Sequence, residues 1–170
     1  MKTEHLLLRT IAQTDLSHVF EGLSNPQVIK YYGVNYTSLK DTEEQMQWFA
    51  NLEVEETGKW WAICDKDNAS FYGAIGINNY SELHQKAELG FWLLPAYWGK
   101  GFVREAANAV LNYCFKTLNL HRVEAFVESE NSNSKSVLSK LGFELEGVMK
   151  DCEIKNGQFI SLAIFAKFNR

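Results

Sequence analysis

The sequence is poor in the features that mark several protein classes. It holds only three cysteines and two prolines, and no apolar run approaches the ~18 residues that a membrane span needs. Cys64, Cys114 and Cys152 are far apart and lack CxxC spacing, which disfavours both a disulfide framework and a zinc site. The four histidines also lack metal-ligand spacing. We therefore expect reduced thiols, no bound metal and no association with membranes.

Positive charge is also scarce. Lysine and arginine total 17 against 21 aspartate and glutamate residues, which gives a formal net charge of −4. Without a basic cluster, nucleic-acid binding is disfavoured. The opening residues 1–5 are followed by only three consecutive leucines, so we expect no signal peptide. Together with the sparse cysteines, this predicts a cytoplasmic protein.

The chain nevertheless has ample material for a core. Its 170 residues are 46% hydrophobic, which excludes intrinsic disorder and suits one domain. No internal repeat or linker divides it, so we expect a single domain over residues 1–170.

Apolar periodicity predicts a mixed sequence of strands and helices. Thr14-Asp15 offers N-cap chemistry for a first helix, which Asn25-Pro26 should end. Thr42-Glu43-Glu44-Gln45 reads as a capping box for a second helix, with Gly58 as its stop. The expected strands are 6–9, 59–64, 71–78, 86–94, 122–128, 143–152 and 159–168, and the further helices are 102–117 and 134–141.

The connections indicate how these elements are joined. Residues 79–85 look like the link of an antiparallel hairpin, and residues 155–158 like a tight hairpin turn. The strand–helix–strand unit at 86–127 should be a parallel crossover. The fold class is therefore mixed α/β.

A glycine-containing loop joins the strand at 86–94 to the helix at 102–117. The free N–H groups and the dipole of a helix N-terminus attract anions, and Gly99 and Gly101 allow close backbone approach. Lys100 and Arg104 add positive charge. The loop fits neither a P-loop, because Gly101 follows Lys100, nor a dinucleotide fingerprint, because Arg104 replaces its third glycine. On spacing alone, an ordinary tight turn explains it equally well.

Residues 97–106, Tyr-Trp-Gly-Lys-Gly-Phe-Val-Arg-Glu-Ala, resemble the acetyl-CoA loop of the GNAT N-acetyltransferases. The family pattern is Gln/Arg-x-x-Gly-x-Gly/Ala, and this chain departs from it with Trp98 at the first position and Val103 at the last. The Trp-Gly-Lys-Gly form resembles the subgroup of ribosomal-protein-alanine N-acetyltransferases. Three other segments resemble the same subgroup in the same order: 6–9, 87–93 and 131–143.

The resemblance implies a mostly antiparallel central sheet of about seven strands flanked by about four helices. It also implies acetyl-CoA as co-substrate and direct attack by a primary amine in a ternary complex. Glu88 is the candidate general base, because a carboxylate among aromatic groups can have a raised pKa. A glutamate on a solvated strand face, or one paired with a lysine, is the plain alternative.

The resemblance also assigns residues to the coenzyme. The backbone of Trp92, Leu93 and Leu94 would bind the pantetheine arm, and Asn131 would hold the pantetheine side of the coenzyme. The pyrophosphate would lie on the loop and the helix start, formed by Trp98, Gly99, Lys100, Gly101, Phe102, Val103 and Arg104.

Two positions depart from the family. Many GNAT enzymes have a tyrosine acid where this chain has Leu138, so Ser134 or water would serve the leaving thiolate; otherwise Asn131 and Ser134 are simple helix caps. Ser161 stands near the place of a subgroup aspartate.

Trp60 and Trp61 would line an acceptor channel or only pack in the core.

The leading function is therefore acetyl transfer from acetyl-CoA to a protein or peptide N-terminus. The alternatives are acetylation of a small amine (a polyamine, an amino acid or an antibiotic), or a weakly catalytic CoA-binding module. The sequence leaves open whether the protein is a homodimer.

Overall fold

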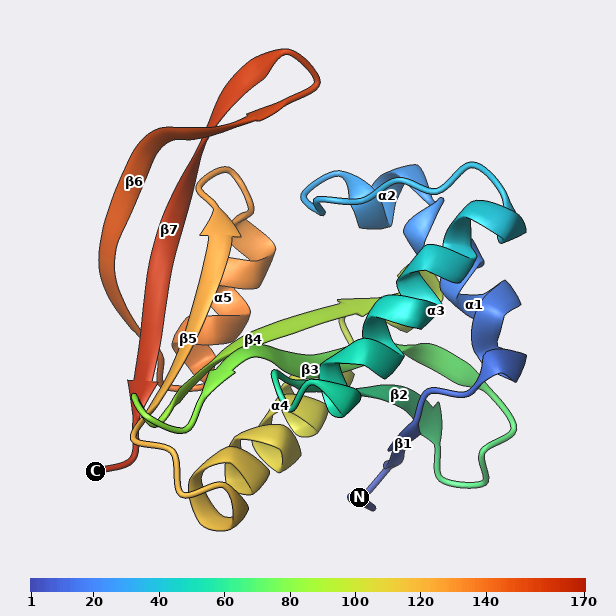
Figure 1. Ribbon diagram of the computed structural model, residues 1–170, viewed down its shortest axis with the longest axis horizontal. Helices are drawn as coiled ribbons and strands as arrows, with labels where there is room; N and C mark the ends of the chain where they lie inside the picture. The colour runs from blue at the N-terminus through green and yellow to red at the C-terminus, as the bar shows by residue number, and fades with distance from the viewer.

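The computed structural model describes residues 1–170, and its seven strands form one sheet in the order β1-β2-β3-β4-β5-β7-β6 (Figure 1). Neighbouring strands are antiparallel except β4 and β5, which are parallel. The strands are β1 Leu6–Thr10, β2 Lys59–Asp65, β3 Phe71–Ser81, β4 Lys86–Leu93, β5 Arg122–Glu128, β6 Glu144–Lys155 and β7 Gln158–Phe168. The helices are α1 Leu16–Leu23, α2 Pro26–Ile29, α3 Leu39–Val54, α4 Phe102–Asn112 and α5 Ser132–Lys140.

This arrangement confirms the predicted mixed α/β fold, with its mostly antiparallel sheet and central parallel crossover. The sequence correctly predicts the hairpin between β3 and β4. It also predicts the tight turn after β6, where Asn156 and Gly157 both have positive φ. We find five α-helices rather than about four, because α2 is not predicted. No helix is both long and apolar enough to cross a membrane.

The sheet has a hydrophobic core on each face. One core joins α4 and α5 to the sheet and includes Val110 and Leu138, neither of which is exposed to solvent. The other joins α1 and α3 to the opposite face and includes Phe49, Trp60 and Trp92. The two faces explain why strands such as β2 read as continuous apolar runs: both sides of the strand are covered.

The sheet divides at its only parallel pair. β4 and β5 are in register only from Lys86 to Glu88 and from Arg122 to Glu124. Beyond these residues β4 continues beside β3, and β5 continues beside β7. In Figure 1 the two strands leave the same corner of the molecule and point apart, so the sheet opens as a V.

The predicted ends of the second helix are wrong. α3 begins one turn before Thr42, and its N-cap is Ser38, whose side chain accepts a hydrogen bond from the Asp41 N–H. Thr42 is buried, and its hydroxyl donates to the Ser38 carbonyl at 2.8 Å. Gly58 does not end the helix, which stops at Val54. A Cβ at Gly58 would lie 2.3 Å from the Ile77 carbonyl oxygen, so the glycine is needed for close strand packing.

The predicted capping role of Thr14-Asp15 for α1 is also wrong. Asp15 ends a short 3₁₀ turn, Gln13–Asp15, and its side chain makes no cap hydrogen bond to α1. Instead the carboxylate accepts from the Ala12 N–H and forms two 2.7 Å hydrogen bonds with Arg9. A charged partner outcompetes the helix start for this buried carboxylate.

The helix at 102–117 and the short helix after β5 follow their predicted places with small differences. α4 ends at Asn112 and continues as a π-helical turn, Tyr113–Thr117. α5 begins at Ser132 rather than at residue 134, and Gly142 ends it with a φ of 81°, as predicted.

Candidate active site

A cavity of about 1460 Å³ occupies the opening of the V. It is walled by the parted edges of β4 and β5, by the N-terminal ends of α4 and α5, by the α2 segment and by the β6–β7 hairpin. Pockets for drug-sized ligands commonly measure about 300–1,000 Å³. This cavity can therefore hold a larger ligand together with a second molecule.

The loop before α4 presents free backbone donors to this cavity. Gly99 and Gly101 have left-handed φ angles of 74° and 83°. The first N–H of this segment with an intramolecular partner belongs to Glu105, which donates to Gly101, and the N–H groups of residues 99–104 have none. A Cβ on either glycine would meet nothing within 4 Å. The arrangement is an open cradle of amides at a helix N-terminus, which suits a phosphate group.

Aromatic side chains hold the loop in place. The Tyr72 ring stacks on Tyr97 with centroids 3.9 Å apart, and on Phe102 at 5.1 Å. The Trp98 indole N–H donates to the Leu93 carbonyl at 2.8 Å, which ties the loop to the end of β4. Trp98 thus fills the first position of the loop motif as a brace for the strand end.

The structure places eleven of the thirteen sequence-predicted site residues along the cavity and two outside its lining. The N–H of Leu94 donates to the Tyr72 carbonyl and is already used. The Lys100 ammonium lies 5.6 Å from the centre of the Tyr97 ring. The residues in the lining are Glu88, Trp92, Leu93, Trp98, Gly99, Gly101, Phe102, Val103, Arg104, Asn131 and Ser134.

Glu88 lies at the point where the V begins to open. Its Oε2 accepts a 2.7 Å hydrogen bond from the side-chain amide of Asn79. Asn79 follows Asn78 at an irregularity of β3 and has a φ of 50°, which turns its side chain toward β4. Burial raises the pKa of Glu88, the Asn79 bond lowers it and the charge of Glu124 raises it, with a net increase. A carboxylate of this kind suits a general base.

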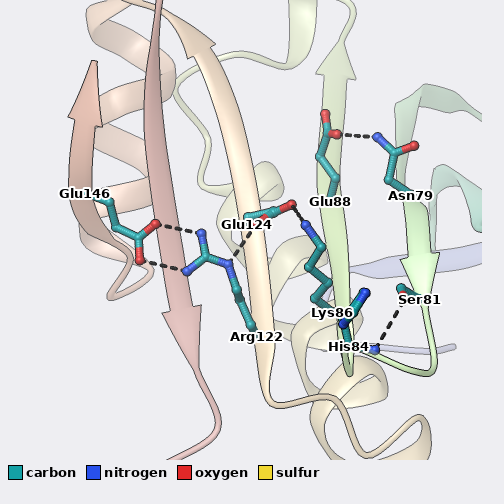
Figure 2. A network of polar contacts seen from close by, with 8 residues as sticks. All are labelled: Asn79, Ser81, His84, Lys86, Glu88, Arg122, Glu124 and Glu146. Atoms are coloured by element: carbon teal, nitrogen blue, oxygen red, sulfur yellow. Dashed lines mark hydrogen bonds and ion pairs between the residues drawn. The ribbon is translucent and has the colours of Figure 1, made fainter. Parts of the chain in front are cut away.

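A chain of ion pairs spans the sheet beside Glu88 (Figure 2). The Lys86 ammonium lies 2.8 Å from Glu124 Oε1, and the Arg122 Nε lies 2.8 Å from Glu124 Oε2. The remaining Arg122 donors form two hydrogen bonds with Glu146. These contacts join β4, β5 and β6 at the closed end of the V.

Asn131 and Ser134 lie on the far wall, at the start of α5. The Asn131 amide oxygen accepts from the Ser134 N–H at 3.1 Å, and its amide nitrogen donates to the Ser134 hydroxyl at 3.0 Å. Asn131 is therefore the N-cap of α5 and fixes the serine hydroxyl beside the cavity. Leu138, one turn later, is fully buried.

Sequence reasoning missed the cavity wall formed by the α2 segment. Tyr32 lies on this wall, and burial, then the nearby charge of Glu88, raises the pKa of its phenol. The adjacent aromatic residues Tyr31 and Tyr32 after Pro26 are a signal that could have marked this segment. Of the two tryptophans on β2, Trp60 lines the cavity, whereas Trp61 packs edge-on against Tyr113 in the core.

Comparison with known proteins agrees with this geometry. Residues 5–144 match the family model of the acetyltransferase (GNAT) domain. The chain is 35% identical over 158 residues to the "Uncharacterized N-acetyltransferase YoaA" of Bacillus subtilis (strain 168), with 92% of this chain and 89% of the relative covered. It is 27% identical to the spermidine N(1)-acetyltransferase of Escherichia coli (strain K12), with 93% of this chain and 84% of that relative covered. It is 24% identical to the ribosomal-protein-serine acetyltransferase of that organism, covering 97% and 93%.

Solved structures share the fold. A GNAT-family acetyltransferase from Bacillus anthracis superposes with a TM-score of 0.87 at 28% identity, covering 99% of this chain and 97% of that one. RimL, a ribosomal-protein acetyltransferase solved in complex with coenzyme A, gives a TM-score of 0.88 at 21% identity, covering 98% and 95%. The family match, the relatives and the split sheet agree, and the chain belongs to the GNAT family of N-acetyltransferases.

Proposed function

We propose that this enzyme transfers the acetyl group of acetyl-CoA to a primary amine, with a protein or peptide N-terminus as acceptor. One observation carries the proposal: Glu88 and the loop before α4, whose N–H groups at residues 99–104 have no intramolecular partner, line the same cavity. An anion cradle and a base in one cavity suit a phosphate-bearing acyl donor and an amine.

The residues present fit coenzyme A. The pyrophosphate would be held by the amides of the loop and of the first turn of α4, with Arg104 at the cavity wall. The pantetheine arm would lie along β4, whose edge from Leu89 to Leu93 has no partner strand on the β5 side. Asn131 would meet this arm from α5. Leu94 has no part in this proposal, because its N–H is already bonded.

The acceptor would reach the thioester from the side of Glu88. An amine attacks a carbonyl carbon only through a free lone pair, and most primary amines are ammonium ions at neutral pH. Glu88 would take the proton, directly or through one water, and Asn79 would hold the carboxylate in place. Its raised pKa brings it closer to neutral pH and makes it a stronger base than an exposed glutamate.

The leaving thiolate would be met by the start of α5. The Ser134 hydroxyl accepts from Asn131, so its own hydrogen is free to point at the sulfur. Leu138 supplies no proton at the family's tyrosine position. We assign the stabilisation of the thiolate to Ser134 and water.

The acceptor class is tested by thiol release from acetyl-CoA. The panel comprises peptides with free N-terminal alanine, serine or methionine, the same peptides with a formylated N-terminus, and spermidine. The acceptors named for two of the relatives, a ribosomal-protein serine and spermidine, are thereby represented. We expect turnover of the free peptides and none of the formylated ones. Turnover of spermidine alone would contradict the N-terminal acceptor and indicate a polyamine instead. No turnover of any amine would overturn the proposed reaction.

A further inference from the structure

Glu124 is a buried carboxylate that has no role in the reaction proposed above. It is 7% exposed, in the middle of β5. In the parallel register its Cα is the direct partner of Glu88, so two glutamates stand opposite each other on neighbouring strands, and the charge of Glu124 acts on Glu88. Such a pair normally costs stability, because like charges in direct opposition repel.

The cation that could pair with either carboxylate is Lys86. Lys86 and Glu88 are two residues apart on one strand, on the same face and about 7 Å apart at their backbones. Lys86 points to Glu124 instead, at 2.8 Å, whereas Glu88 points to Asn79 (Figure 2). Arg122 holds the other oxygen of Glu124 and thereby fixes the carboxylate that receives Lys86.

We propose that Glu124 is a positioning residue that holds the Lys86 ammonium away from Glu88 and so keeps the catalytic carboxylate free to accept a proton. The inference rests on the proposed role of Glu88 as base. Without Glu124, the lysine would turn along its own strand and pair with Glu88. A carboxylate in such an ion pair is a weaker base, and its oxygens are occupied.

Several groups set the charge and the hydrogen bonds around Glu88. Asn78 and Asn79 approach it from β3, Lys86 from β4 and Glu124 from β5, and Tyr32, whose phenol pKa is raised in part by the charge of Glu88, lines the same cavity. Loss of Glu124 removes a negative charge and releases a positive one. Both changes lower the pKa of Glu88, in agreement with the upward effect that Glu124 has on it in the intact protein.

Three variants test the proposal: Glu124→Gln, Lys86→Met and the double variant. We expect Glu124→Gln to lower kcat/KM at pH 7 by about tenfold or more, which is less than the whole contribution of a general base, about 10²–10⁴-fold. The acid limb of the pH profile of kcat/KM should move to lower pH in this variant, because the pKa of Glu88 falls. Lys86→Met should keep the rate within about threefold, since about 0.7 kcal/mol corresponds to that factor, and its acid limb should move to higher pH. The double variant should regain most of the rate lost by Glu124→Gln.

A merely structural clamp between β4 and β5 gives a different pattern. Lys86→Met breaks the same cross-strand ion pair, so it would lose as much activity as Glu124→Gln, and the double variant would recover nothing. Either result overturns the proposal. If circular dichroism shows that Glu124→Gln does not fold, Lys86→Met alone tests the proposal. A rate within about threefold of native supports it, and a large loss overturns it.

A readout without turnover separates this inference from the proposed reaction. In protein labelled with ¹³C at the glutamate carboxyl carbons, Glu88→Gln identifies the Glu88 signal. We expect this signal to titrate at lower pH in Glu124→Gln than in the native protein, whether or not Glu88 is the base. An unchanged titration overturns the role of Glu124. A Glu88→Gln variant with native kcat/KM overturns the proposed role of Glu88 as base instead.

Discussion

The indole of Trp60, on β2, lies against the α-carbon of Gly90, on β4, two strands away. A Cβ at Gly90 would lie 2.8 Å from the six-membered ring of Trp60, closer than such atoms approach. Trp60 on β2, Gly76 on β3 and Gly90 on β4 form one row across the sheet. The two glycines leave a trough that the indole fills, and the same indole lines the cavity.

We expect Gly90→Ala to displace this indole and to narrow the acceptor side of the cavity. Overpacking of this kind costs about 1–3 kcal/mol of stability. KM for the amine should rise, whereas the affinity for coenzyme A should stay within about twofold, because the loop before α4 is untouched and a Cβ at Gly90 meets Trp60 rather than the free edge of β4. Steady-state kinetics and isothermal titration calorimetry measure the two effects. Equal losses for both ligands would contradict the assignment of Trp60 to the acceptor side.

The loop before α4 yields a second prediction. Gly101→Val should abolish coenzyme A binding, because a branched side chain enters the open cradle at a φ of 83°. In the native protein, coenzyme A at a hundred times its Kd should stabilise the fold by about 2.7 kcal/mol, which is a rise in Tm of several degrees at roughly 2–4 °C per kcal/mol. ATP should give a smaller rise.

Gly157→Val is the matched control for backbone strain. Gly157 has a φ of 76°, and a Cβ there also meets nothing within 4 Å, but it lies in the hairpin turn after β6. Both variants should lose about 1–2 kcal/mol to the left-handed conformation. Only Gly101→Val should lose the rise in Tm with coenzyme A. If both keep it, the phosphates bind elsewhere.

The Arg9–Asp15 pair predicts how stability depends on pH. Burial raises the pKa of Asp15, but the Arg9 hydrogen bonds and the Ala12 N–H lower it more, so the net shift is downward. A lowered pKa stabilises the fold above about pH 4, where the unfolded aspartate also ionises, and this contribution is lost as the pH falls through the native pKa.

Asp15→Asn should therefore destabilise the protein by about 1–3 kcal/mol at pH 7, less than for a fully buried pair because Arg9 is 27% exposed. The difference from the native protein should shrink below about pH 4. Urea unfolding at pH 7 and pH 3.5 measures it. A difference that does not change with pH would show that packing, not the ion pair, is lost.

Local patterns predicted the elements better than the contacts between them. The strand at 122–128 has its predicted bounds, because alternation and apolar content are local properties. The start of α3 was misplaced because two capping sequences lie one turn apart, and the burial of Thr42, which decides between them, depends on tertiary packing. The short α2 spans only Pro26–Ile29 and has no periodic stripe, so periodicity does not predict it, and only the adjacent Tyr31 and Tyr32 mark this part of the cavity wall in the sequence.

The site shows the same division. The glycine loop and Glu88 stand out in the sequence because each needs an unusual residue in a recognisable local pattern. The pairing of Lys86 with Glu124 depends on the register of two strands joined by a long crossover, and such a register is not a local property of either strand. Nothing local to Glu124 distinguishes it from a surface glutamate.

The pH profile of kcat/KM for the native enzyme and Glu88→Gln is the most direct test of acetyl transfer with Glu88 as the base. The substitution keeps the shape of the side chain, so affinity for coenzyme A should hardly change. We expect a loss of about 10²–10⁴-fold near pH 7. The loss should shrink toward the pKa of the amine, near 8 for an α-amino group, since free amine needs no base. Native rates for Glu88→Gln across the whole profile would contradict this assignment.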